Sequence, residues 1–391
     1  MKGKQLALAA VLAAVATTTT PVTAMADSGP IPRIVSAEIA TTGPVVHVNA
    51  ERTALIRYSS RAADGSPADM TGSVLFPRVA PPTDGWPIAV LSHMTVGSAD
   101  RCAPSTMQAG HPELVRAHSL DAVAARMLDA GFVVVRPDFE GIGTPGPHPY
   151  LMGRPLARSV IDAARASTGL DDRIGRDVAL VGHSEGAVAS LFAAAADTSD
   201  WGPLRLRSVA AVTPPTEMRR ILELATPVTV AGPGIGDTVA LAALLIGGAS
   251  TVDPEFAEAV RSGGLSERAA ALLPDIETKC FGELASADSF GGLAPSMLLG
   301  PEGARVAAML GTVADDNDVR HLRIDPAVPI RLDAGLFDPV APAPLIAGLA
   351  EKYRSAGSDV TYAVQPGART PVPSLPAAAD EIAQWSIQRV R

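Results

Sequence analysis

Short apolar runs recur along most of the chain, and stretches with a helical pattern lie between them. Each run has four or five residues, many of them β-branched, which is typical of a buried strand. The runs predicted as strands are residues 54–58, 72–76, 87–91, 132–136, 178–181, 209–212, 329–332 and 360–364. Strands that alternate with helices indicate an α/β fold with a mostly parallel central sheet, covered by helices on both faces.

Two of the intervening helices have readable ends. Residues 120–130 repeat apolar side chains at helical spacing, with Ser119 as the predicted N-terminal cap and Gly131 at the C-terminal end. Pro376 is suited to the first turn of a last helix. These signals predict one helix before the strand 132–136 and another after the last strand, 360–364.

The pattern changes between residues 216 and 323. Strand-like runs give way to helical, glycine-rich sequence such as 241–248. We interpret this interval as a helical cap inserted into a core formed by 27–215 and 324–391, over the sheet edge where α/β proteins bind ligands. An elaborate pair of ordinary crossover helices is the alternative. The apolar run 239–248 is shorter than the roughly 18 residues that a membrane span needs.

The first residues have the order of a secretory signal peptide. Two lysines precede an apolar run over 6–16, and Ala24 and Ala26 have the spacing of a cleavage site. We expect residues 1–26 to be removed and the mature protein to be secreted.

Composition narrows the choice of partners. Asp and Glu outnumber Lys and Arg by 41 to 32, so the net charge of −9 offers no basic surface for nucleic acid. We find no motif for a metal, a phosphate or a redox group, and we predict no metal and no cofactor. We expect a monomer.

The chain has two cysteines, Cys102 and Cys280. In a secreted protein such a pair predicts a disulfide, here between segments far apart in the sequence. Two buried thiols are the alternative.

The pentapeptide Gly182-His183-Ser184-Glu185-Gly186 has the pattern G-x-S-x-G. It lies between the predicted strand 178–181 and the helix-forming run 187–194, which is the order that a nucleophile elbow needs. Such a turn projects the Ser184 hydroxyl toward substrate and needs glycine on both sides, because a Cβ would collide with neighbouring backbone. His183 would point away from that hydroxyl and is interpreted as a packing residue.

The order of residues after the elbow gives an acid but no base. In α/β-hydrolases the nucleophile is followed by an acid and then by a histidine. Asp338, in a turn after the strand 329–332, and Asp333, at the end of that strand, are the candidate acids. All seven histidines precede Asp338, so none follows the acid.

Four parts of the sequence carry a resemblance to a known family. They are 92–97 with 102–105, 138–143 with 149–150, the elbow, and 335–342. In these parts the chain resembles the secretory lipase family of α/β-hydrolases, over most of its length after the leader. The resemblance implies a secreted lipase or esterase with a mobile cap, and a disulfide that joins Cys102 to Cys280 in the cap. It also implies a lipid or ester substrate, transient contact with a lipid interface, and Asp338 as the acid, at the position of the family motif Gly-x-x-Asp.

The resemblance also implies an oxyanion hole. The loop after the strand 87–91 usually reads His-Gly-Thr in the family and reads His93-Met94-Thr95 here. The N–H of Met94 or Thr95 would act with that of Glu185. His93 is interpreted as a hydrogen-bonding residue that shapes the loop.

The family's catalytic histidine follows the last strand, and Arg369 stands in that position here. Arginine remains protonated and has no acceptor, so it cannot take the proton of Ser184 and would instead pair with Asp338. Loss of such a histidine costs on the order of 10⁶ in kcat. The sequence therefore predicts a hydrolase with impaired activity.

Three functions stay open. One is an ester hydrolase for apolar acyl chains, the second is a non-catalytic protein that holds a lipid or ester under the cap, and the third is a peptidase or acyltransferase. Arg369 separates the first from the second. A histidine such as His93 or His148 folding over Ser184 is an alternative base.

Overall fold

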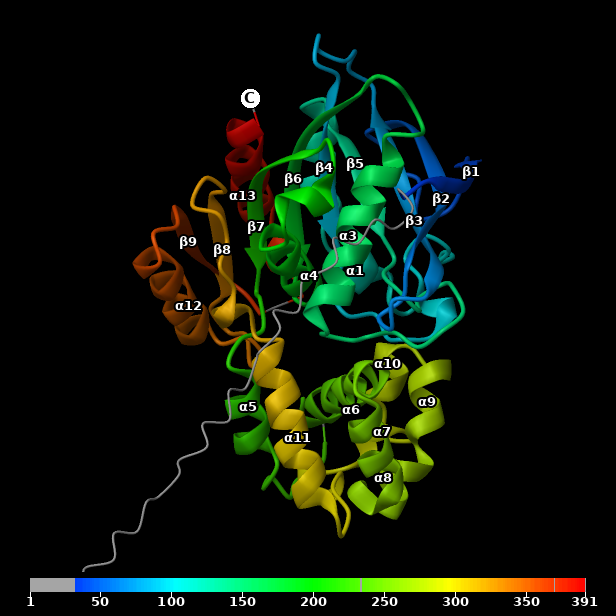
Figure 1. Ribbon diagram of the computed structural model, residues 1–391, viewed down its shortest axis with the longest axis vertical. Coiled ribbons are helices and arrows are strands. Elements are labelled where there is room, and N and C mark those ends of the chain that lie inside the picture. The colour runs from blue at the N-terminus through cyan, green and yellow to red at the C-terminus, as the bar shows by residue number, and fades with distance from the viewer. Residues whose placement is uncertain (1–31, 233, 369, 391) are drawn as a thin grey trace, which may run out of the picture. The chain divides into compact units, whose positions relative to one another are not determined.

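A nine-stranded sheet forms the centre of the computed structural model, which describes residues 32–232, 234–368 and 370–390 (Figure 1). The strands are β1 (Ile34–Ala40), β2 (Ala50–Arg61), β3 (Pro67–Pro77), β4 (Trp86–Ser92), β5 (Val133–Pro137), β6 (Ile174–His183), β7 (Arg205–Val212), β8 (Ile330–Gly335) and β9 (Val360–Gln365). Their order is β1-β2-β3-β5-β4-β6-β7-β8-β9. Pairing is antiparallel from β1 to β5 and parallel from β5 to β9. Each of the eight predicted runs falls on a strand, and the mostly parallel sheet is confirmed.

Helices cover both faces of the sheet. The core helices are α1 (Leu114–Ala117), α2 (Asp121–Asp129), α3 (Gly153–Ser167), α4 (Glu185–Ala194), α12 (Ala343–Ser355) and α13 (Pro376–Val390). Alternate residues of the central strands pack into two separate buried clusters, one with α2 and α13 and the other with α3, α4 and α12. The continuous apolar run 178–181 is fully buried because its side chains enter both clusters in turn.

The predicted helix ends are right in one case and wrong in another. The last helix begins at Pro376, as expected. The helix α2 begins at Asp121, and no side chain caps it. The Ser119 hydroxyl instead lies 2.8 Å from Nδ1 of His183, so it serves a tertiary hydrogen bond and does not cap the helix.

Between β7 and β8 the described residues form helices and no strand of the sheet. They are α5 (Met218–Ala225), α6 (Ile235–Val252), α7 (Pro254–Ala259), α8 (Glu267–Ala271), α9 (Leu273–Thr278), α10 (Phe281–Leu284) and α11 (Gly303–Asp316). These helices gather beyond the ends of the strands that lead into the elbow and into the β8 loop (Figure 1). We refer to residues 216–323 as the cap.

The helix α6 is longer than the apolar run read from the sequence. It has 18 residues and is long and apolar enough, by length and composition alone, to cross a membrane. Half of its residues are buried against the rest of the protein, including Val239 and Leu244. In this structure α6 is the central helix of the cap.

Candidate active site

Ser184 lies at the sharp turn between β6 and α4. Its backbone has φ 55° and ψ −111°, a conformation that side-chain-bearing residues rarely adopt, and its N–H donates to the carbonyl of Val212 at 2.8 Å. Such a conformation costs on the order of 1–3 kcal/mol and persists where the surroundings hold it. The strand, strained turn and helix at Ser184 have the geometry of a nucleophile elbow.

Both glycines of the pentapeptide are required by close backbone packing. A Cβ on Gly186 would lie 2.6 Å from the carbonyl oxygen of His93 and closer still to that of Ser92. A Cβ on Gly182 would lie 2.5 Å from the Ser190 hydroxyl and closer to the carbonyl of Gly186. The start of α4 therefore rests directly on the end of β4, which places the elbow beside the loop that follows β4.

Three N–H groups at this junction have no protein acceptor in the described part of the chain. The loop 93–97 follows β4, whose last residue, Ser92, pairs with Gly182 next to the elbow. Among the described residues, no hydrogen-bond acceptor meets the backbone N–H of Met94, Thr95 or Glu185. All three residues are buried. Buried N–H groups usually have partners, so the N–H of Glu185 together with that of Met94 or Thr95 is suited to an oxyanion.

His93 shapes the loop through its ring. Its Nδ1 lies 2.8 Å from the carbonyl of Met94, and its Nε2 lies 3.4 Å from the carbonyl of Asp138. The Asp138 carboxyl is buried and binds the backbone N–H of Ser105 at 2.9 Å. Burial raises the pKa of Asp138, although the hydrogen bonds from Ser105 oppose the increase. These contacts hold the loop 93–97 in place through His93.

The two candidate acids have different surroundings. Asp338, in the loop after β8, is buried, and its Oδ1 accepts hydrogen bonds from the N–H groups of Val340 (2.9 Å) and Ala341 (3.0 Å). Asp333 is bound by both arms of the Arg331 guanidinium, at 2.7 and 2.8 Å. Arg331 also pairs with α13, so Asp333 belongs to a structural ion pair and Asp338 is the better candidate acid.

The predicted base position lies outside the described residues, because Arg369 is one of the residues left undescribed. All seven histidine rings are described, and each has a hydrogen-bond partner. The partners include Asn49 and Asp121 for His47, Met94 and Asp138 for His93, Glu113 and Cys280 for His111, Asp121 for His118, Glu140 and Glu185 for His148, Ser119 for His183, and Arg320 for His321. None of these contacts brings an imidazole to Ser184 as a base.

Two contacts near the elbow have no signal in the sequence. The Nε2 atom of His148 lies 2.7 Å from a carboxylate oxygen of Glu185, the residue after the nucleophile. The hydroxyl of Tyr150 lies 3.0 Å from that of Thr95. His148 was considered as a base over Ser184, and the structure places its ring against Glu185 and the carbonyl of Glu140 instead.

An apolar cavity of about 130 Å³ lies between the cap and the core. Side chains of α5, α6 and α11 line it from the cap, and Tyr150, Leu151, Pro339 and Val340 line it from the core. Pro339 and Val340 directly follow the candidate acid. A cavity with mostly apolar walls fits an acyl chain.

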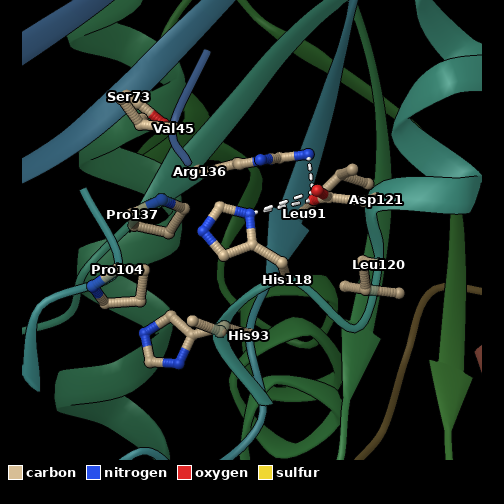
Figure 2. A pocket seen from close by; sticks show the side chains of 11 residues that line it. Val45, Ser73, Leu91, His93, Pro104, His118, Leu120, Asp121, Arg136 and Pro137 are labelled. Atoms are coloured by element: carbon tan, nitrogen blue, oxygen red, sulfur yellow. Dashed lines mark hydrogen bonds and ion pairs between the residues drawn. The ribbon is translucent and has the colours of Figure 1, made fainter. Parts of the chain in front are cut away.

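A second, much smaller cavity of about 20 Å³ lies behind the loop that contains His93 (Figure 2). Figure 2 shows His118 and Arg136 pointing toward the carboxylate of Asp121, at 3.2 and 2.8 Å. Burial raises the pKa of Asp121, but Arg136 and His118 together bring it below its ordinary value. This cavity is the size of a water molecule and is bordered by a structural ion cluster.

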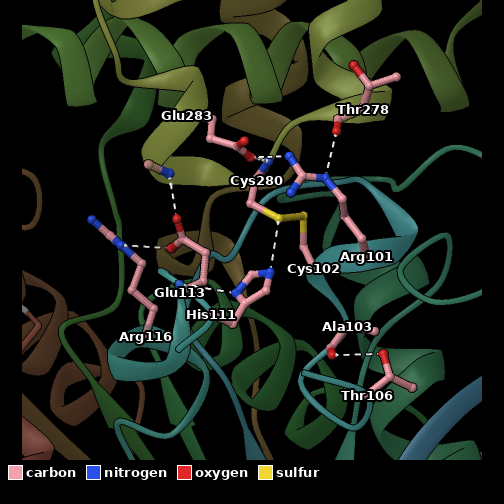
Figure 3. The surroundings of a disulfide bond; sticks show 11 residues. Arg101, Cys102, Ala103, Thr106, His111, Glu113, Arg116, Thr278, Cys280 and Glu283 are labelled. Carbon is pink, nitrogen blue, oxygen red and sulfur yellow. Dashed lines mark hydrogen bonds and ion pairs between the residues drawn. A yellow bond between two sulfur atoms is a disulfide. The ribbon is translucent and has the colours of Figure 1, made fainter. Parts of the chain in front are cut away.

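The cap is fastened to the core beside the same loop (Figure 3). Cys102 and Cys280 form the predicted disulfide, and Arg101 forms an ion pair with Glu283 of α10. Figure 3 shows the Arg101 guanidinium also reaching the carbonyl of Thr278, at 2.9 Å. One edge of the cap is therefore attached to the core by a disulfide and by an ion pair.

The fastened edge of the cap contacts the loop 93–97 itself. The N–H of Phe281 donates to the carbonyl of Val96 at 2.9 Å, and Gly97 pairs with Cys280 as an antiparallel bridge. Gly97 has φ 113°, and a Cβ there would lie 2.8 Å from Cys280 Cα. The cap segment at Cys280 thus packs as closely on the loop as a neighbouring strand.

We expect removal of the disulfide to destabilise the protein by about 3–5 kcal/mol. The bridge closes a loop with a sequence separation of 178 residues, and long loops gain most from closure because the unfolded chain loses most freedom. The C102A/C280A double variant and the wild type should be compared by urea unfolding, with and without reductant. Reductant should destabilise the wild type alone. Equal stability of the two oxidised proteins would show that the bridge contributes nothing.

The sheet order, the helices on both faces and the serine at the turn after β6 define an α/β-hydrolase fold. Residues 116–389 match the Secretory lipase family, and the chain belongs to this family. Lipase 9 of Candida albicans is 28% identical over 225 residues, which cover 55% of this chain and 46% of that protein. The match thus spans less than half of this longer relative.

Solved structures share the fold. Candida antarctica lipase A superposes with a TM-score of 0.70 at 17% identity, over 90% of this chain and 82% of that one. The rice cell wall degrading esterase LipA from Xanthomonas oryzae superposes with a TM-score of 0.71 at 16% identity, over 92% and 99% of the two chains. At these identities the likeness concerns the fold alone.

Proposed function

We propose that this chain is a secreted ester hydrolase of lipase type, with Ser184 as nucleophile and Asp338 as the acid. The strained elbow at Ser184 carries the proposal, because a serine at φ 55° between a central strand and a helix has no structural advantage over glycine. The family, the disulfide and the signal-like residues 1–26, which lie outside the described residues, support export. We propose that it acts as a monomer.

The chemistry would begin with attack of the Ser184 hydroxyl oxygen on the ester carbonyl carbon. A carbon–oxygen bond forms, the carbonyl electron pair moves to oxygen, and the N–H groups of Thr95 and Glu185 bind the resulting oxyanion. The hydroxyl proton must leave, and the alcohol must receive a proton as its bond to carbon breaks. With arginine at 369, no histidine follows Asp338 to make either transfer, so we propose that turnover is slow.

Hydrolysis of a short and a long p-nitrophenyl ester by the wild type and by Ser184→Ala tests this proposal. We expect the wild type to exceed Ser184→Ala by a small factor, about tenfold or less, since p-nitrophenolate leaves without a proton but the serine has no base. Equal rates for the two proteins would reject turnover by the native chain.

A second candidate is a non-catalytic protein that binds a lipid or an ester under the cap. The observation that favours it is the combination of an apolar cavity of about 130 Å³ with the absence of a histidine after Asp338. Both candidates need an acyl chain in the cavity, so binding can be tested separately from turnover.

Two neighbouring alanines of α11 offer a matched test of the cavity. Ala307 lines it, and Ala308 is exposed on the outer side of the same helix. We expect Ala307→Phe to weaken binding of a pyrene-labelled fatty acid at least about tenfold, because the ring fills the space, and Ala308→Phe to leave it unchanged. Fluorescence titration gives both values. Equal affinities would remove the cavity from the proposal.

A further inference from the structure

Both oxyanion donors are carried by residues whose side chains contact one short segment, residues 148–151. Thr95 and Glu185 belong to different parts of the chain, after β4 and after β6. The hydroxyl of Tyr150 lies 3.0 Å from that of Thr95, and Nε2 of His148 lies 2.7 Å from Oε1 of Glu185. All four residues are buried, so water does not compete for these contacts.

The ring of His148 is fixed in one orientation. Its Nδ1 lies 2.7 Å from the carbonyl of Glu140, which can only accept, so Nδ1 carries a hydrogen. The other nitrogen then shares a proton with Glu185. The second carboxylate oxygen of Glu185 is buried, and no partner for it lies among the described residues. Glu185 therefore depends on His148, and loss of the ring would leave a buried carboxylate unpaired beside the nucleophile.

The same segment forms part of the wall of the cap cavity. Tyr150 and Leu151 line that cavity. The cap helix α6 rests on the Tyr150 backbone, where a Cβ on Gly248 would lie 2.6 Å from the Tyr150 nitrogen and closer to its carbonyl oxygen. Leu151 has φ 58°, so a backbone conformation unfavourable for leucine is maintained at the cavity wall. A ligand in the cavity would therefore contact the segment 148–151, whose side chains also contact Thr95 and Glu185.

We propose that His148 and Tyr150 are positioning residues that couple occupation of the cap cavity to the placement of the oxyanion donors. An acyl chain in the cavity restricts the position of Tyr150. Tyr150 then orients Thr95 through the hydrogen bond between their hydroxyls, and His148 orients Glu185. Long acyl chains gain reactivity at Ser184 as well as affinity. This inference rests on the proposed role of Ser184 and adds to it the basis of acyl-chain selectivity.

The experiment measures covalent labelling of Ser184 by two alkyl fluorophosphonates, one with a two-carbon and one with a twelve-carbon chain. The serine oxygen forms a bond to phosphorus, the phosphorus–fluorine bond breaks, fluoride leaves, and the hydroxyl proton passes to water. Intact-protein mass spectrometry over hours gives a rate for each probe in the wild type and in the Arg369→His background. The ratio of the long-chain rate to the short-chain rate is the readout.

We expect Tyr150→Phe to reduce the long-chain rate about tenfold, as for loss of one well-placed hydrogen bond, and to bring the ratio close to one. Its ring remains in the cavity wall, so affinity for the pyrene-labelled fatty acid should not change. Tyr58→Phe is the matched control, because the Tyr58 hydroxyl is also buried and donates at 3.1 Å to the carbonyl of Ser159 in α3, which is not one of the proposed oxyanion donors. It should leave the ratio as in the wild type.

His148 gives an independent arm. We expect His148→Leu to slow labelling by both probes about tenfold or more, and His148→Gln, which keeps a donor for Glu185, to restore most of the rate. A Tyr150→Phe ratio equal to that of Tyr58→Phe would overturn the coupling. A loss of fatty-acid affinity in Tyr150→Phe would also overturn it, since Tyr150 would then act as cavity wall alone. No labelling at Ser184 in either background would reject the proposed nucleophile itself.

Discussion

Replacing Arg369 by histidine is expected to raise ester hydrolysis about 10³-fold. We propose from the family resemblance that position 369 is that of the base, and a triad without its histidine loses on the order of 10⁶ in kcat, of which a histidine introduced there should recover part. Initial rates on a short and a long p-nitrophenyl ester measure the gain. The rate should rise with pH through roughly 6.5, the ordinary pKa of histidine, because the neutral imidazole is the base.

Three companion variants make the result specific. Arg369→Gln removes the charge without adding a base and should stay near the wild-type rate. Ser184→Ala combined with Arg369→His should lose the gain, because the new base has no nucleophile to serve. The hydrolysis rate of Thr370→His tests whether the base position is one residue further along the chain. If Arg369→His is no faster than Arg369→Gln, position 369 is not the place of the base, and the binding candidate becomes the better account.

The central strands could be predicted from the sequence because burial on both faces leaves continuous apolar runs. β1 was missed for the opposite reason: five of its seven residues are exposed, and it pairs at the edge of the sheet through its backbone. Local preference predicts Ser119 as the N-terminal capping residue of α2. In the structure its hydroxyl instead forms a hydrogen bond with His183, 64 residues away. Local patterns thus identify elements whose stabilising contacts are local or uniformly apolar.

The elbow could be predicted because its signals are adjacent in the sequence. The glycines, the serine and the flanking strand and helix occupy one continuous segment, and the lack of a histidine after Asp338 follows from chain order alone. The contacts of His148 with Glu185 and of Tyr150 with Thr95 join residues 37 and 55 positions apart. No periodicity encodes such pairs, since they depend on how the segment after β5 folds back over the elbow.

A pair of glycine-to-alanine changes should have opposite effects on stability. Both Gly186 in α4 and Gly348 in α12 lie within helices, where alanine is favoured by about 0.5–1 kcal/mol. Gly348 has open space around its missing Cβ, so Gly348→Ala should raise the free energy of unfolding by about that amount. Gly186 has the carbonyls of Ser92 and His93 in that place, so Gly186→Ala must separate α4 from β4 and should cost about 4 kcal/mol or more.

Urea unfolding followed by circular dichroism measures both changes. Gly186→Ala should also lose the Ser184 labelling described above, because the elbow and the loop 93–97 are held at the distance that this glycine permits. Gly348→Ala should keep it, since α12 packs on β8 and β9 and the Gly348 site is open. If Gly186→Ala were as stable as Gly348→Ala, the close approach of α4 to β4 would not exist, and the placement of Thr95 and Glu185 as joint donors would fail with it.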